Sequence, residues 1–345
     1  MKKQNLFMIT IDGSIGGGQI LRTAVSLSAL TLKPIKVINI RSSRPRPGLM
    51  PQHLAGIRIA AEYCKAELVG AQYSSMEVEF IPTKLDVKDK VIDIGTSGSI
   101  GLLFQTLTPL LVLSDKRVKL EIIGGTAGLG SPTIEYVKHV TFPVLNKMGV
   151  YLPEIKILRQ GFYPKGGGKV EMSFEPSKIF RIQVVDSGEV KSIKGFSVAG
   201  SLPESTAARQ ADAARNVLKK FKDVSIETSS VGTFSQGTSI TLCAECENSI
   251  LGSSALGERG LRAEDVGTMA GEELLKSIES KTALDKYMAD QIIPFMALAD
   301  GKSTIKVEEI TNHCRTSIAV CEKILGCKFS VDESSKIIEV NGIKF

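Results

Sequence analysis

Two segments in the first half of the chain share one order of features at a spacing of 81 residues. A short apolar strand pattern leads into a Gly-rich turn and then an amphipathic helix pattern, first around Asp12 and again around Asp93. A second strand pattern follows each time, and Val37 then corresponds to Val118 at the same offset. A repeat of about 80 residues is longer than the unit of a solenoid, so it predicts a duplicated αβ subdomain.

Each of the two repeated segments ends with a strand pattern of period two. These patterns are MEVEFIP from Met76 and KVEMSFEP from Lys169, and apolar and polar residues alternate in each. Such alternation is typical of half-buried antiparallel strands. We therefore predict an α+β fold and not a doubly wound α/β fold.

The later part of the chain predicts two further regions. A polar turn cluster near 184–190 precedes alternating strand and helix patterns that continue to about 280, which indicates an inserted αβ module. The patterns after 281 return to the first architecture as a third unit. We predict a large domain formed by residues 1–183 and 281–345, with a smaller inserted αβ domain formed by 184–280.

Composition excludes few function classes. The net charge of +6 is compatible with an anionic substrate and does not require one. No apolar run approaches the ~18 residues of a membrane span, and the basic N-terminus lacks a cleavage site, so we expect a cytoplasmic protein. The six cysteines show no disulfide framework. The absence of tryptophan and the low aromatic content of 6% disfavour base-stacking sheets of the RRM kind.

The first Gly-rich turn, DGSIGGGQILR at 12–22, is a candidate anion site. Successive glycines allow close backbone approach, and the helix expected from about Gln19 offers free N–H groups at its start. A tight structural turn explains the glycines equally well. The turn is not a Walker A loop, because no Lys-Ser/Thr follows at the required spacing.

A second candidate is the basic loop IRSSRPRPGLMPQHL at 40–54. Arg41, Arg44 and Arg46 repel one another unless they meet phosphates or carboxylates, and the prolines restrict the loop that carries them. A solvated basic loop is the alternative. His53 is expected on the following helix as a packing residue, and His139 is expected to pack within a helix.

His313 is the strongest catalytic candidate. It lies where a strand pattern gives way to a helix pattern, beside hydroxyl and amide side chains that cap helices or bind phosphate oxygens. Arg315 adds a positive charge, and the helix dipole favours an incoming anion. A neutral imidazole in such a place would be an effective nucleophile towards phosphorus. The residue types alone leave a structural role open.

Six separated blocks resemble the RNA 3′-terminal phosphate cyclase family in order and content. They are IDGSIGGGQILRTAVSLSAL, IRSSRPRPGLMPQHL, GFYPKGGG, SALGERGLRAEDVG, YMADQIIPFMALA and HCRTSIAV, and the resemblance runs from Ile9 to about Phe329. It implies three repeats of a small αβ unit, each with two helices on a four-stranded sheet, plus an inserted module. It also implies ATP-dependent conversion of an RNA 3′-phosphate to a 2′,3′-cyclic phosphate through histidine–AMP and an adenylylated RNA end.

The resemblance also assigns expected roles to residues. His313 would be the nucleophile, and Asp290 would orient it or the nucleotide. ATP and RNA with a 3′-phosphate are the expected partners, with Mg²⁺ or Mn²⁺ accompanying the nucleotide. The remaining expectations are Gln105, Tyr287, Met288, Ala289, Asp290 and Gln291 for ATP, and Arg22, Arg41, Arg44 and Gln52 for phosphates of ATP or RNA.

One departure from the family, two alternative functions and the oligomeric state stay open. Family members usually read Gly-Glu-Gly-Gly-Gly-Gln in the first turn, whereas this chain is two residues shorter there and lacks the acid, so no metal ligand is assigned, although Asp12 is a candidate substitute. A non-catalytic relative that binds RNA in ribosome biogenesis would lack the histidine. A transferase making enolpyruvyl sugars or shikimates would not need the His313 block. The oligomeric state is open, with a homodimer as one possibility.

Overall fold

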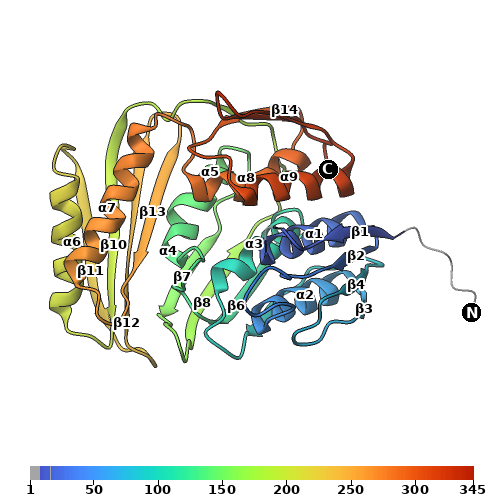
Figure 1. Cartoon of the computed structure of the whole chain (residues 1–345), viewed down its shortest axis with the longest axis horizontal. Helices are drawn as coiled ribbons and strands as arrows, with labels where there is room; N and C mark the ends of the chain where they lie inside the picture. Colours follow the sequence, from blue (N-terminus) through green and yellow to red (C-terminus); the bar gives the residue numbers. More distant parts are fainter. Residues whose placement is uncertain (1–7, 16) are drawn as a thin grey trace, which may run out of the picture.

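The computed structural model describes residues 8–15 and 17–345 (Figure 1). Within these residues the strands form four sheets of four strands each, and helices pack against them. The predicted mixed α+β class is confirmed. No helix in this described part of the chain is both long and apolar enough to cross a membrane.

The first sheet has the strand order β1-β2-β4-β3. Its first pair is parallel, because a helix connects the two strands, and its other pairs are antiparallel. Its elements are β1 (Ile9–Asp12), α1 (Gly18–Thr31), β2 (Ile35–Ile38), α2 (Pro51–Cys64), β3 (Glu67–Val69) and β4 (Val78–Ile81).

The second sheet has the order β5-β6-β8-β7, again with a parallel first pair followed by antiparallel pairs. The helical stretch that carries His139 contains a π-helical segment in its middle. The elements are β5 (Lys90–Asp93), α3 (Ile100–Val112), β6 (Val118–Gly124), α4 (Ile134–Tyr136), the π-helix (Val137–Thr141), α5 (Phe142–Asn146), β7 (Glu154–Arg159) and β8 (Gly168–Phe174).

The strand pairing shows that the offset of 81 residues between the two units is not constant. Ile11 pairs with Val37, whereas Ile92, its counterpart at that offset, pairs with Ile122 and not with Val118. The second unit therefore has more residues between its two paired strands than the first. The element order of the two units agrees, but their spacing is not constant.

The third sheet joins strands from distant parts of the chain in the order β15-β16-β14-β9. The strand β9 (Gln183–Val184) pairs in parallel with β14, and the other two pairs are antiparallel. The remaining elements of this region are α8 (Lys286–Leu298), β14 (Lys302–Lys306), α9 (Asn312–Leu325), β15 (Phe329–Asp332) and β16 (Ile337–Asn341).

The fourth sheet, in the order β11-β10-β12-β13, lies at one end of the molecule (Figure 1). Helices α6 and α7 pack on it and share a separate apolar core with it, while α4 contacts β12 and β13. Its elements are β10 (Val190–Gly200), α6 (Glu204–Val217), β11 (Val224–Val231), β12 (Gly237–Cys246), β13 (Ile250–Leu256) and α7 (Ala263–Glu279). We call residues 190–279 the β10–α7 module. The division of the chain into repeated units and an inserted domain stays a prediction.

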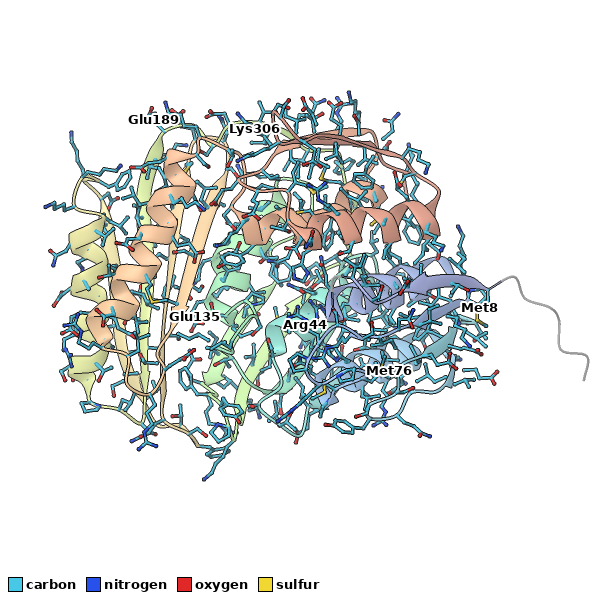
Figure 2. The ribbon with its side chains drawn as sticks, in the orientation of Figure 1. Met8, Arg44, Met76, Glu135, Glu189 and Lys306 are labelled. Atoms are coloured by element: carbon cyan, nitrogen blue, oxygen red, sulfur yellow. The ribbon has the colours of Figure 1, made fainter. Side chains whose placement is uncertain are left out.

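Helices α1, α2, α3, α8 and α9 pack together between the first three sheets. Their buried faces contribute to one continuous apolar core, and side chains fill the space between the ribbons (Figure 2). This arrangement brings the beginnings of α1, α2 and α9 towards one region, although they are up to 295 positions apart in the sequence, from Gly18 to His313.

Candidate active site

A cavity of about 820 Å³ opens between the helix cluster and the β10–α7 module. Its volume falls within the range of small-molecule sites. Residues from α1, α3, α8 and α9 form one wall, and the end of β13 with α7 forms another. Six residues expected to act on ATP or phosphate line it: Arg22, Gln105, Tyr287, Asp290, Gln291 and His313.

His313 is held at the start of α9 by a cap. The side chain of Thr311 accepts a hydrogen bond from the backbone N–H of Cys314 at 3.2 Å, which fixes where the helix begins. Burial, together with the charges of Arg22 and Arg44, lowers the pKa of His313 from its ordinary value. The ring is therefore neutral at physiological pH and keeps a lone pair on one nitrogen.

Gln19 determines which ring nitrogen is free. Its side-chain oxygen lies 2.5 Å from Nδ1 of His313, and its amide nitrogen donates to Oδ2 of Asp290 at 2.7 Å. A carboxylate facing the amide nitrogen leaves the amide oxygen to accept from Nδ1–H. The Nε2 lone pair of His313 is then free. Asp290 thus reaches the histidine through Gln19, and we call this chain of two hydrogen bonds the relay.

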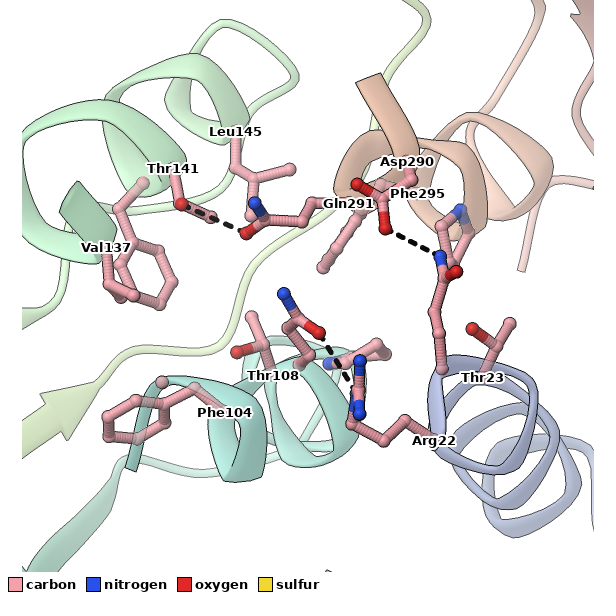
Figure 3. Close-up of a pocket in the computed structure, with 16 residues that line it drawn as sticks. Arg22, Thr23, Phe104, Thr108, Val137, Thr141, Leu145, Asp290, Gln291 and Phe295 are labelled. Carbon is pink, nitrogen blue, oxygen red and sulfur yellow. Dashed lines mark hydrogen bonds between the residues drawn. The ribbon is translucent and has the colours of Figure 1, made fainter. Parts of the chain in front are cut away.

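Asp290 and Arg22 are two ionisable side chains in this wall. Burial raises the pKa of Asp290 to about 7, and the positive charge of Arg22 opposes that rise. Burial likewise lowers the pKa of Arg22 to about 10, so its guanidinium stays protonated at neutral pH. Its Nε donates to Oε1 of Gln105 at 3.0 Å (Figure 3). Arg22 is therefore a fixed positive charge facing the cavity.

A small inner cavity of about 40 Å³ lies behind these side chains (Figure 3). Arg22, Gln105, Asp290 and Gln291 line both cavities, and the inner one is otherwise largely apolar. Gln291 is fixed there by two hydrogen bonds, accepting from the hydroxyl of Thr141 at 3.2 Å and donating to the carbonyl of Tyr287 at 2.8 Å. The polar wall is thus positioned by neighbouring helices before any ligand enters.

Two of the residues expected to bind ATP lie elsewhere. Met288 and Ala289 are completely buried in the helix cluster and are not among the residues that line the cavity. They occupy the core face of α8, whereas Tyr287, Asp290 and Gln291 occupy its cavity face. The structure therefore brings three of these five consecutive residues to the cavity.

Residues expected to bind phosphate are distributed over two cavities. Arg22 lines the first, and Arg41 and Gln52 line a second cavity of about 970 Å³. The two cavities adjoin, because Leu102, Leu129 and Leu256 line both of them. Arg44, exposed on the same loop as Arg41, contributes charge near His313.

The basic loop is not simply solvated. Arg41 has a positive φ of 53°, and its Nη1 donates to the carbonyl oxygens of Arg46 and Gly48 at 2.8 and 3.0 Å. Of the three arginines of this loop, Arg41 therefore has two contacts: it stabilises the loop through its hydrogen bonds, and it lines the second cavity.

The other two histidines have packing environments. His53 is buried, its Nδ1 accepts from the backbone N–H of Met50 at 3.1 Å, and burial lowers its pKa to about 3. A Cβ on Gly18 would lie only 2.4 Å from Nε2 of His53, so this position must be glycine for the ring to pack. His139 stacks on Phe196 at 4.2 Å between ring centroids, and burial lowers its pKa to about 4.

The described residues do not offer a metal cage of their own. Among residues 8–15 and 17–345, no three His, Cys, Asp or Glu side chains group closely enough to hold an ion. The carboxylate of Asp12 accepts from the backbone N–H of Ser14 and from the amide of Asn39, at 3.0 and 3.2 Å. Asp12 is thus engaged in its own turn. Part of the shortened Gly-rich turn, residue 16, lies outside the described residues.

Gln19 lies in this site although the sequence pattern gives it no role there. The residue stands directly after the three glycines, at the start of α1, where the pattern indicates only the beginning of a helix. A polar side chain that is buried at a helix start signals a specific partner.

Neutralising Arg44 should raise the pKa of His313. The Arg44→Gln variant removes one of the two positive charges that disfavour protonation of the ring, so protonation becomes easier. An NMR titration of the imidazole signals measures the change. Arg46→Gln is the matched control, because Arg46 is exposed on the same loop and should leave the pKa of His313 as it is. Equal pKa values in both variants would contradict the placement of Arg44.

Comparisons with known proteins identify the family. A family profile described as RNA 3′-terminal phosphate cyclase matches residues 14–331. The RNA 3′-terminal phosphate cyclase of Pyrococcus abyssi is 44% identical over 94% of this chain and 95% of its own length. The cyclase of Methanosarcina barkeri is 43% identical over 97% and 99%, and that of Caldivirga maquilingensis is 42% identical over 96% and 97%.

One solved structure gives only a weak likeness. The enolpyruvyl transferase NikO from Streptomyces tendae has a TM-score of 0.21 and 11% identity, covering 96% of this chain and 81% of that one. Such a score supports no conclusion about fold or function. The family profile and the relatives, by contrast, each cover most of the chain. The chain belongs to the RNA 3′-terminal phosphate cyclase family.

Proposed function

We propose that this protein converts an RNA 3′-terminal phosphate into a 2′,3′-cyclic phosphodiester, using ATP and a covalent histidine–AMP intermediate. Family membership supports the cyclase activity. The observation that carries the histidine chemistry is the relay from Asp290 through Gln19 to Nδ1 of His313. It leaves Nε2 unprotonated at the wall of a cavity large enough for a nucleotide.

In the first step, Nε2 of His313 attacks the α-phosphorus of ATP. A P–N bond forms, the bond to the bridging oxygen breaks, and pyrophosphate leaves. The ring gains positive charge in this step, and the Gln19 oxygen stabilises it by accepting from Nδ1–H. Arg22 offsets the negative charge that develops on the phosphate oxygens.

In the second step, an oxygen of the RNA 3′-phosphate attacks the phosphorus of the histidine–AMP. The P–N bond breaks, its electron pair returns to Nε2, and AMP is carried on the RNA end. In the third step, the neighbouring 2′-oxygen attacks the 3′-phosphorus, loses its proton and displaces AMP. Splitting the reaction in this way replaces a poor oxygen leaving group with AMP.

The first cavity is the proposed ATP site. Gln105, Tyr287 and Gln291 provide polar groups there, beside Arg22 and Asp290. Mg²⁺ or Mn²⁺ is expected to enter with the nucleotide phosphates, since divalent magnesium is commonly held by substrate phosphates and only a few protein ligands.

A cyclisation assay tests the proposal. The protein is incubated with ATP, Mg²⁺ and a single-stranded RNA that ends in a 3′-phosphate. We expect a product resistant to phosphatase, with one AMP and one pyrophosphate released per end cyclised. An RNA with a terminal 2′-deoxyribose 3′-phosphate should stop at the adenylylated end, because it lacks the attacking oxygen. Binding of RNA without any ATP consumption would instead indicate a non-catalytic RNA-binding protein.

A further inference from the structure

Two of the sequence blocks that mark the family have no role in the chemistry above, and they meet at the second cavity. Tyr163 and Pro164 of GFYPKGGG lie on one side of it, in the loop between β7 and β8. Glu258 and Arg259 of SALGERGLRAEDVG lie on another, in the loop between β13 and α7. The second cavity thus lies between the helix cluster and the β10–α7 module, next to the first.

Tyr163 is an exposed aromatic side chain on an anchored loop. Its side chain is 78% exposed, although the preceding residue, Phe162, is buried. The loop is tied to the β10–α7 module, because the backbone N–H of Lys165 donates to the hydroxyl of Ser235 at 3.0 Å. A rigid aromatic group that is held open to solvent loses little conformational entropy when a flat ligand stacks on it.

Glycine in this loop makes the anchor possible. Gly167 has a φ of 71°, and a Cβ there would lie 2.2 Å from the ring of Phe234. Phe234 therefore packs directly on the backbone of the loop, and the guanidinium of Arg159 stacks on this ring at 4.5 Å. This contact holds the backbone of the loop in place and leaves the side chain of Tyr163 exposed.

Two arginines line the same cavity. Arg259 is exposed, and the structure records no ion pair for it within the described residues. Arg41 on the basic loop and the amide side chain of Gln52 also line this cavity. Glu258 supplies one opposing negative charge. An aromatic face beside guanidinium groups is the combination that binds single-stranded nucleic acid, with stacking for a base and charge for its phosphate.

The connection between the cavities sets the direction of such a strand. Leu102, Leu129 and Leu256 form the shared boundary, so a chain that ends at His313 continues past them into the second cavity. Leu129 is 77% exposed there and offers an apolar edge to a base.

We propose that the second cavity binds the nucleotides that precede the RNA 3′ end, with an unpaired base stacked on Tyr163 and a backbone phosphate bound by Arg259 and Arg41. This inference rests on the proposed cyclase function. It predicts a preference for single-stranded ends without base specificity, because every base has a face that can stack.

Length dependence of the substrate tests the stacking contact. Tyr163→Ala should lower kcat/KM for a single-stranded oligonucleotide 3′-phosphate by about tenfold. The same variant should leave cyclisation of a nucleoside 3′-monophosphate, and self-adenylylation without RNA, close to the values of the unaltered protein. Tyr163→Phe should behave like the unaltered protein, since the ring is kept. Tyr151→Ala is the matched control, because Tyr151 is 61% exposed and lines neither cavity.

RNA affinity measured without ATP keeps this test separate from the cyclase proposal. Fluorescence anisotropy with a labelled oligonucleotide 3′-phosphate should show about tenfold weaker binding for Tyr163→Ala, even if no cyclisation occurs. Equal affinities of Tyr163→Ala and Tyr151→Ala would overturn the inference. So would a blunt duplex with the same 3′-phosphate that binds as tightly as the single strand, because its bases cannot stack on the ring.

Salt dependence tests the arginine contact. Arg259→Ala should reduce the slope of log affinity against log salt concentration by about 0.7 for a single strand, as expected when one phosphate contact is lost. Arg117→Ala is the control, because Arg117 pairs with Glu175 and lies outside both cavities. An unchanged slope in Arg259→Ala would remove this residue from the binding surface.

Discussion

His313→Ala should lose all detectable adenylylation, a fall of about 10³-fold or more, when the protein is incubated with α-labelled ATP and Mg²⁺. The reason is that the only attacking nitrogen in the account is removed, while the cavity and its arginine remain. The measurement is protein-bound label after denaturation, which should be acid-labile and stable to base.

The other histidines provide matched controls. His53→Ala and His139→Ala remove the only other imidazoles in the chain, and neither side chain lines the first cavity. Both variants should keep the label, although His53→Ala lies near Arg22 and should bind ATP less well. Label that persists in His313→Ala would place the covalent chemistry on another residue.

Asp285→Ala should lower the free energy of unfolding by about 3 kcal/mol. Oδ1 of this buried carboxylate accepts from the backbone N–H groups of Tyr287 and Met288 at 2.9 Å and from the hydroxyl of Tyr136 at 2.8 Å. Its Oδ2 accepts from the N–H of Gly252 at 2.9 Å. The substitution leaves these donors buried without an acceptor. Urea denaturation measures the loss.

Two further variants test whether the loss of stability comes from the hydrogen bonds of Asp285. Asp285→Asn should be intermediate, because its oxygen can keep the cap of α8 while its amide nitrogen faces the N–H of Gly252. Asp186→Ala should cost less than about 1 kcal/mol, because Asp186 is exposed and accepts only in its own turn. An Asp285→Ala protein as stable as Asp186→Ala would contradict the role of this carboxylate in joining α8, α4 and β13.

The sequence predicts the elements of the fold better than their exact register. Capping residues mark helix starts in the sequence, since Asp285 and Thr311 cap α8 and α9 just where the apolar helix patterns begin. The sequence does not single out the strands β13 and β15, because their strand patterns are weak outside the sheets to which they belong. The offset of 81 residues between the first two units does not hold for the paired strands, because aligning the two sequences does not show which residues pair across strands.

The site was predicted by residue type, and its geometry was not. Residues from five separated segments line the two adjoining cavities. Helical spacing alone predicts that Tyr287, Asp290 and Gln291 lie on one face of their helix, away from the face of their buried neighbours. Met288 and Ala289 follow the core face of the same helix. In the relay, Gln19 contacts Asp290, which is 271 positions away in the sequence, and His313, which is 294 positions away. Only the packing of α1 against α9, and of α9 against α8, brings these side chains together.

Mapping the adduct by mass spectrometry shows directly whether His313 carries AMP. The protein is incubated with ATP and Mg²⁺ without RNA, digested under alkaline conditions and sequenced by tandem mass spectrometry. We expect one AMP group on the peptide that contains His313, located on the imidazole and lost on mild acid treatment. An AMP group on a lysine, or an unmodified His313 peptide from protein that nevertheless cyclises RNA, would contradict it.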